Sequence, residues 1–259
     1  MTILCIETST SVCSAAVCKD GALIKQCISY EGSNHARLLP SYIEELLSFT
    51  REQHLSLDAV ALSEGPGSYT GLRIGTSTAK GLCYGLSVPL IAVPTLEVLC
   101  EAARQHSAFS IQHSDILVPM IDARRMEVYT AIFDSESKVE SPKSKEERAR
   151  AVVIENEESV LCQNSGLYSV SAAVSTLAAE RSYFYFGDGA AKCQAVLTSP
   201  RWHYIPDIVP QAQYMGGLVE RRESEEDSPK MISGAELAYY EPFYLKEFVA
   251  VKSHVKGLN

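Results

Sequence analysis

The start of the chain alternates between short apolar runs, which are typical of β-strands, and turn signals. Residues 3–7, 15–18 and 23–30 form three short apolar runs, and polar or turn-forming residues follow each of them. Asp20 and Gly21, between the second and third runs, form the strongest two-residue hairpin signal. The pattern predicts an antiparallel meander of three strands.

The next segments alternate between helix and strand periods. Residues 35–49 carry apolar side chains on one helical face, and Asn34 stands where a helix cap is expected. The members of this face are Leu38, Leu39, Tyr42, Ile43, Leu46 and Leu47. The later segments predict strands over 57–62 and 88–93 and helices over 70–85 and 95–104. This order of elements is typical of a complete α/β unit.

A second α/β unit follows a polar stretch. Residues 105–115 lack apolar periodicity, so we predict a domain boundary there, with domains over 1–105 and 106–259. The second unit is expected to contain strands over 116–121, 127–133 and 183–186 and a helix over 211–222. Residues 134–150 mix charges of both signs and indicate a solvated insertion.

The composition is that of an ordinary globular protein, since 46% of the 259 residues are hydrophobic and 21% are charged. An excess of 32 acidic over 23 basic residues gives a net charge of −9, which disfavours direct nucleic-acid binding because Lys and Arg supply the affinity for phosphates. The eight cysteines show no C-x-x-C pair and no zinc-ligand spacing, as expected in a reducing cytoplasm. No apolar run approaches the ~20 residues of a membrane helix. We therefore expect a cytoplasmic protein without membrane contact.

A glycine-rich loop at residues 65–73 follows a predicted strand and opens a predicted helix. Such a position can bind an anion through free N–H groups. However, Gly71 is followed by Leu72 and Arg73 instead of the Lys-Ser/Thr of a phosphate-binding P-loop, and the glycine spacing does not match the dinucleotide fingerprint. The alternative, a tight strand-to-helix turn, is favoured.

The helix after this loop carries two stripes of small residues. Glycine costs about 1 kcal/mol relative to alanine inside a helix, so such stripes indicate close packing against neighbours. One stripe is Gly71, Gly75 and Ala79, and the other is Ser77, Gly81 and Gly85. One neighbour is expected to be the sheet. The second is either a helix of a partner subunit or the chain's own first helix.

Several strings along the chain resemble a known family. They are Ile6-Glu7-Thr8-Ser9, Asn34-His35, the whole run from Gly65 to Gly75, Ala79-Lys80-Gly81-Leu82, Asp122-Ala123-Arg124 and, more weakly, Gly187-Asp188-Gly189-Ala190 and Pro242 to Leu245. The chain is similar in them to the TsaB (YeaZ) family, bacterial partner subunits in the synthesis of threonylcarbamoyl-adenosine on tRNA. The resemblance implies an α/β fold of two actin-like ATPase lobes (ASKHA, ribonuclease H-like).

The family has a catalytic paralogue, TsaD, which transfers the threonylcarbamoyl group and holds a metal through two histidines. At the corresponding positions this chain has Thr95 and Leu99, and leucine offers no lone pair to a cation. After its E-T-S string the paralogue has a cysteine and acidic residues, where this chain has Thr10, Ser11 and Val12. The substitutions predict a subunit without catalytic residues, without a metal and without a cofactor of its own.

The resemblance also implies partners and the sites that contact them. The expected partners are the TsaD-type catalytic subunit, a TsaE-type ATPase and tRNA through the complex only, with a homodimer in isolation. The expected partner interface is Leu38, Leu39, Tyr42, Ile43, Leu46, Tyr69, Arg73, Gly75, Thr76 and Lys80. A residual nucleotide site of low affinity at the subunit boundary would use Thr8, Ser9, Thr10, Gly187 and Gly189. The main alternative is an ATP-dependent phosphotransferase or ATPase that acts alone, and a direct RNA-binding module is a third.

Overall fold

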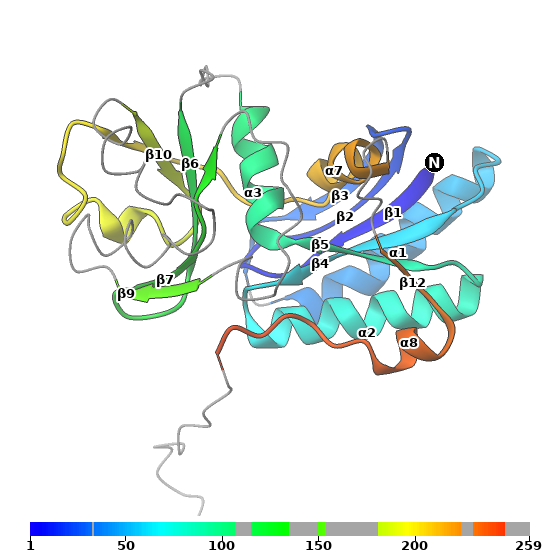
Figure 1. Ribbon diagram of the computed structural model, residues 1–259. Coiled ribbons are helices and arrows are strands. Elements are labelled where there is room, and N and C mark those ends of the chain that lie inside the picture. Colours follow the sequence, from blue (N-terminus) through cyan, green and yellow to red (C-terminus); the bar gives the residue numbers. More distant parts are fainter. Residues whose placement is uncertain (33, 107–114, 135–149, 154–180, 224–229, 247–259) are drawn as a thin grey trace, which may run out of the picture.

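A computed structural model describes residues 1–32, 34–106, 115–134, 150–153, 181–223 and 230–246, which form two α/β lobes beside each other (Figure 1). The predicted insertion over 134–150 lies almost entirely outside these residues. Among the described helices, none is long and apolar enough to cross a membrane.

The first lobe is built on a six-stranded sheet. Its strands are β1 (Thr2–Glu7), β2 (Cys13–Lys19), β3 (Ala22–Ser29), β4 (Ala59–Gly65), β5 (Leu90–Pro94) and β12 (Met231–Ile232). They lie in the order β12-β5-β4-β1-β2-β3. The predicted antiparallel meander is confirmed in β1, β2 and β3, and β4 and β5 continue the sheet in parallel with β1.

Helices cover both faces of this sheet, because side chains on successive strand residues point to opposite sides. Leu4 and Ile6 of β1 pack in a core with α1 (His35–Glu52) and α2 (Tyr69–Leu86). Ile3 and Cys5 face the opposite side, in a core with residues of α3 (Thr95–Arg104) and α7 (Gln213–Glu223). The helices predicted over 35–49, 70–85, 95–104 and 211–222 are therefore confirmed.

The helix starts differ in their chemistry. Ser68 caps α2 because its hydroxyl accepts a hydrogen bond from the N–H of Gly71 at 3.4 Å. Asn34 occupies the cap position of α1 as predicted, but its side chain makes no capping hydrogen bond. His35 is buried instead, with Nε2 3.2 Å from the carbonyl oxygen of Val12, which ties α1 to the turn after β1.

The second lobe repeats the strand plan of the first. Its strands are β6 (Ile116–Asp122), β7 (Glu127–Thr130), β8 (Phe133–Asp134), β9 (Arg150–Val153), β10 (Tyr183–Phe186) and β11 (Trp202–Ile205). The order is β11-β10-β6-β7-β9, with β6, β7 and β9 antiparallel and β10 and β11 parallel to β6. The single strand expected over 127–133 is divided into β7 and β8. Two lobes of this shared order make the expected actin-like, ribonuclease H-like fold.

The chain returns to the first lobe after β11. Helix α7 packs on β1, β2 and β3, and β12 pairs with β5 at the edge of the first sheet. Helix α8 (Gly234–Tyr239) follows and lies below α2 (Figure 1). The predicted division into 1–105 and 106–259 is therefore wrong for part of the C-terminal region, because α7 and β12 belong to the first lobe.

Candidate functional site

A cleft of about 750 Å³ lies between the two lobes. From the first lobe it is lined by the turn after β1, by the glycine loop and by the first turn of α2, and from the second lobe by the end of β6 and by Asp188. Residues 243–246 complete the lining. Of the five residues predicted for a nucleotide, Ser9 and Thr10 line this cleft, whereas Thr8, Gly187 and Gly189 do not.

The glycine loop packs directly onto the turn after β1. A side chain on Gly67 would overlap the carbonyl oxygen of Ser9, and one on Gly75 would overlap the hydroxyl of Thr8. The N–H of Ser68 donates to the carbonyl oxygen of Ser9 at 2.6 Å. Gly67 is therefore required by close backbone packing and Gly75 by the Thr8 side chain, as the tight-turn interpretation predicts.

Two backbone donors of the first turn are used within the chain. The N–H of Ser9 donates to Glu7 Oε1 at 2.6 Å, and the N–H of Val12 donates to the hydroxyl of Thr10 at 3.4 Å. An anion bound at the Ser9 amide would have to replace the Glu7 carboxylate.

The corresponding turn of the second lobe shows the same arrangement. A side chain on Gly187 would overlap the carbonyl oxygen of Met120, and a Cβ on Gly189 would lie 2.8 Å from the carbonyl carbon of Ile121. The N–H of Gly189 donates to the carbonyl oxygen of Met120 at 3.0 Å. The N–H of Ala190 donates to the carbonyl oxygen of Gly187 at 3.1 Å. Neither turn presents these amides to a phosphate.

Two carboxyl groups belong to the two turns: Glu7 ends β1 beneath the first turn, and Asp188 of the second turn lines the cleft. Glu7 is fully buried, and burial raises the pKa of its carboxyl group above its ordinary value of 4.5, although the bond from Ser9 opposes this shift. Its second oxygen, Oε2, has no hydrogen-bond partner among the described residues. The Asp188 side chain faces the cleft, and desolvation by the surrounding atoms raises the pKa of its carboxyl group. This carboxylate accepts a hydrogen bond from the N–H of Asp122 at 2.9 Å. In the sequence, Glu7 stands out only through the family string, although a single acidic residue in an apolar strand is itself a usable signal.

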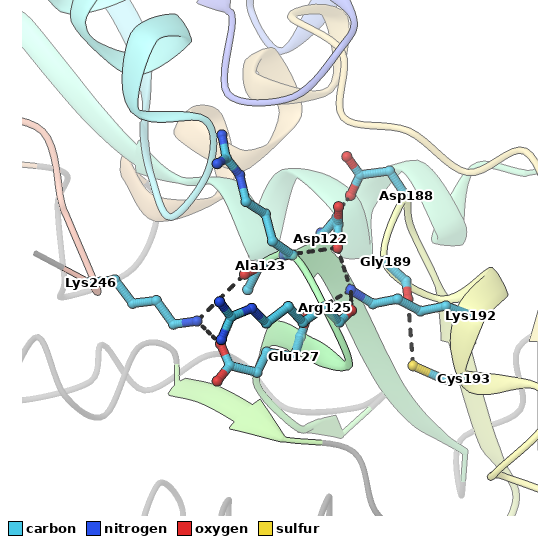
Figure 2. A network of polar contacts seen from close by, with 10 residues as sticks. Asp122, Ala123, Arg125, Glu127, Asp188, Gly189, Lys192, Cys193 and Lys246 are labelled. Carbon is cyan, nitrogen blue, oxygen red and sulfur yellow. Dashed lines mark hydrogen bonds and ion pairs between the residues drawn. The ribbon is translucent and has the colours of Figure 1, made fainter. Parts of the chain in front are cut away.

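A strained hairpin lies on the second-lobe side of the cleft, between β6 and β7 (Figure 2). Arg124 and Arg125 have φ values of 67° and 52°, in the left-handed region that non-glycine residues rarely adopt. Lys192 holds the hairpin by an ion pair with Asp122 and by donating to the carbonyl oxygens of Arg125 at 2.8 Å and of Glu127 at 2.7 Å. No motif or spacing in the chain indicates this role of Lys192.

The positions that correspond to the paralogue's metal histidines are occupied by structural residues. The hydroxyl of Thr95 lies 2.7 Å from that of Ser63 and accepts the N–H of Gly65 at 3.1 Å. Leu99 is fully buried in the core that joins the lobes. In the described part of the chain, no three His, Cys, Asp or Glu side chains lie close enough together to hold a metal ion.

Half of the predicted interface residues lie inside the chain. Leu39, Ile43 and Leu46 are buried in the core between α1 and the sheet, and Gly75 and Thr76 face the sheet from α2. The prediction that they form an interface is wrong, because buried side chains cannot contact a partner. Leu38 and Tyr42 are half-buried at the margin of the same core.

The remaining predicted interface residues are Tyr69, Arg73 and Lys80, which lie on α2 with side chains that are at least partly exposed. Arg73 donates to the hydroxyl of Tyr69 at 2.8 Å and lies over its ring. Lys80 donates to the carbonyl oxygens of Ala238 at 2.7 Å and of Tyr240 at 3.2 Å, so it joins α2 to the segment around α8.

The two stripes of small residues have different neighbours. Gly71, Gly75 and Ala79 are buried, and the two glycines contact the turn after β1. Gly81 and Gly85 face open space, since a Cβ at either position would have no atom of the described residues within 4 Å. Helix α1 therefore does not cover the second stripe. Two adjoining grooves of about 530 and 720 Å³ run between the helices beside it, and Tyr84 is 86% exposed next to it.

Comparison with known proteins identifies the family. A family model described as TsaD, tRNA N6-adenosine threonylcarbamoyltransferase, matches residues 29–238, well over half of the chain. The chain belongs to this family. Within it, the chain is similar to proteins named tRNA threonylcarbamoyladenosine biosynthesis protein TsaB. The identity is 37% over 135 residues for the protein of Bacillus subtilis, covering 51% of this chain and 55% of that protein.

Two further relatives and one solved structure support this placement. TsaB of Escherichia coli is 34% identical over 134 residues, covering 51% of this chain and 55% of that protein. A tRNA N6-adenosine threonylcarbamoyltransferase of Geobacter is 34% identical over 113 residues, covering 38% and 33%. The chain spans about half the length of the curated TsaB relatives it matches. The structure of YeaZ from Pseudomonas aeruginosa superposes with a TM-score of 0.65 at 23% identity over 94% of this chain and 99% of that chain, which shows the shared fold.

Proposed function

We propose that this chain is a non-catalytic subunit that binds and stabilises a TsaD-type transferase during formation of threonylcarbamoyl-adenosine on tRNA. The observation that carries the proposal is the uncovered stripe of Gly81 and Gly85 on α2. Glycine inside a helix is unfavourable unless close packing compensates it. Nothing among the described residues packs there, so a helix of another subunit is the expected neighbour.

The cleft supports the non-catalytic part of the proposal. Its two glycine turns pack closely against neighbouring segments, and the amides of Ser9 and Gly189 donate hydrogen bonds within the chain. The Asp188 carboxyl group lines the cleft, where a phosphate would bring further negative charge. Thr95 and Leu99 serve the internal structure at the positions that correspond to the paralogue's metal ligands. A residual nucleotide site stays a prediction, with Ser9 and Thr10 as its cleft-lining residues.

The proposed partner surface is the outer face of α2 with the margin of α1. Ser77, Gly81 and Gly85 supply the close approach, and Tyr84 and the Tyr69–Arg73 pair supply larger side chains around it. The same surface would support a homodimer in isolation. A TsaE-type ATPase and tRNA would join through the complex in the cytoplasm.

The proposal is tested by mixing the purified chain with the TsaD-type subunit of the same organism and measuring the mass in solution. We expect a 1:1 complex that Gly81→Trp abolishes, since an indole would prevent close helix approach. Two matched controls should still pair: Gly81→Ala at the same position, and Gln194→Trp, which places the same side chain on the exposed surface of the second lobe. Full pairing by a folded Gly81→Trp variant would contradict the proposed surface.

The alternative of an enzyme acting alone makes an opposite prediction. A phosphotransferase or ATPase would hydrolyse ATP with magnesium in the absence of any partner. The proposal predicts no turnover above that of a heat-inactivated sample, measured as released phosphate.

A further inference from the structure

A short segment near the end of the described chain connects the two lobes. It comprises residues 242–246 and is called the strap. After α8 the chain runs along α2 towards the second lobe (Figure 1). Four of its five residues line the interlobe cleft.

The first part of the strap is firmly anchored. The N–H of Phe243 donates to the carbonyl oxygen of Glu64 at 2.7 Å, and the Phe243 side chain is buried with Leu99 and Phe186 in the core that joins the lobes. The backbone of Phe243 also lies so close to residue 65 that only glycine fits there, because a Cβ on Gly65 would lie 2.5 Å from the carbonyl oxygen of Phe243.

The second part of the strap makes weaker contacts to both lobes. The ring of Tyr244 lies 5.0 Å from the ring of Tyr69 at the start of α2. Lys246 forms an ion pair with Glu127 and lies 3.5 Å from the carbonyl oxygen of Ala123 (Figure 2). Its ammonium group also lies over the ring of Tyr129. Partly exposed ion pairs and single ring contacts contribute little individually, so this half is held less firmly than Phe243.

The contacts form a continuous series across the molecule. Arg73 bonds to Tyr69, Tyr69 contacts Tyr244, and two residues further Lys246 holds the hairpin between β6 and β7. We propose that residues 244–246 form a two-position latch that couples the first turn of α2 to this hairpin. Anything that binds at Arg73 and favours one position of the latch then changes the cleft, and the reverse holds equally. This coupling is a property of the isolated chain and does not depend on the proposed function.

Amide hydrogen exchange of the full-length chain tests the latch. The reporting amides are those of Ala123 and Glu127 in the hairpin and of Gly71 and Leu72 in α2, which all donate hydrogen bonds. We expect Lys246→Ala to raise exchange at both reporters at least threefold. Arg73→Ala should also raise exchange in the hairpin, which it does not touch. Lys230→Ala is the matched control, because it removes an exposed ion pair to Glu236 in the same C-terminal segment but away from the strap.

The double variant separates the latch from two local effects. If one latch is released by either change, Arg73→Ala with Lys246→Ala raises hairpin exchange no further than Lys246→Ala alone. If the two substitutions instead multiply each other's effect on the exchange rate of the hairpin amides, the proposal is overturned. Hairpin exchange unchanged in folded Arg73→Ala would overturn it too, and so would an equal effect of Lys230→Ala.

Discussion

Thr8 and Gly71 lock the turn after β1 onto the start of α2. The hydroxyl of Thr8 donates to the carbonyl oxygen of Gly71 at 2.8 Å, while a side chain on Gly71 would overlap the carbonyl oxygen of Thr8. Both residues are buried. Backbone meets backbone here, so only a residue without a Cβ fits at position 71.

Gly71→Ala should therefore destabilise the fold by about 3 kcal/mol, since the backbone of Thr8 has to move to admit a methyl group. Urea unfolding followed by circular dichroism measures the change. The same substitution at Gly81 is the control, because its Cβ meets open space. There we expect a gain of about 0.5–1 kcal/mol from helix propensity. Equal loss at both positions would refute the packing argument for the loop.

A second prediction concerns the pH dependence that Glu7 imposes. Burial raises the pKa of this carboxyl group above 4.5, so the folded chain binds the proton more tightly than the unfolded chain. The stability of the wild type should then fall as pH rises from 4.5 to the folded-state pKa, by up to about 1.4 kcal/mol for each pH unit in that window. Below 4.5 the group contributes no further change.

Glu7→Gln removes this dependence and keeps an oxygen that can accept the N–H of Ser9. Its stability relative to the wild type should be greatest at neutral pH and smallest near pH 4, measured by urea unfolding at both values. Asp20→Asn serves as the control, because Asp20 is exposed and bonded to the N-terminal ammonium group. A difference between wild type and Glu7→Gln that is constant across this range would contradict the buried-carboxyl interpretation.

Local patterns in the sequence predicted the first lobe well. The period of residues 70–85 matches α2 over Tyr69–Leu86, and the Asp20-Gly21 signal matches a turn in which both residues have positive φ, 49° and 76°. These features are decided by neighbours along the chain, which the sequence displays. The structure also supports the interpretation of the glycine loop as a tight strand-to-helix turn. The sequence could predict this turn because the loop lacks the P-loop motif.

Features that depend on distant segments were missed. The pairing of β12 with β5 rests on backbone bonds of the two residues Met231 and Ile232, too few to produce a periodic pattern. The apolar face of α1 was recognised, but periodicity does not reveal what covers a face. Leu39 and Leu46 meet the chain's own sheet, and the pattern that assigned them to a partner could not distinguish the two neighbours.

A third prediction tests how far the returning segment stabilises the first lobe. Arg221 of α7 forms an ion pair with Glu101 of α3, whose side chain is 4% exposed. Arg221→Ala leaves that carboxylate buried beside Gln105 Nε2 at 2.8 Å and Arg104 at 3.9 Å. We expect a loss of about 1–2 kcal/mol, below that of a fully buried pair because the Arg221 side chain is 53% exposed.

The control is Lys230→Ala, which breaks an exposed pair with Glu236 and should change stability by less than about 0.5 kcal/mol. Equal effects of the two substitutions in urea unfolding would mean that α7 is held to α3 by its apolar contacts alone, with Met215 and Leu218 as the next residues to truncate.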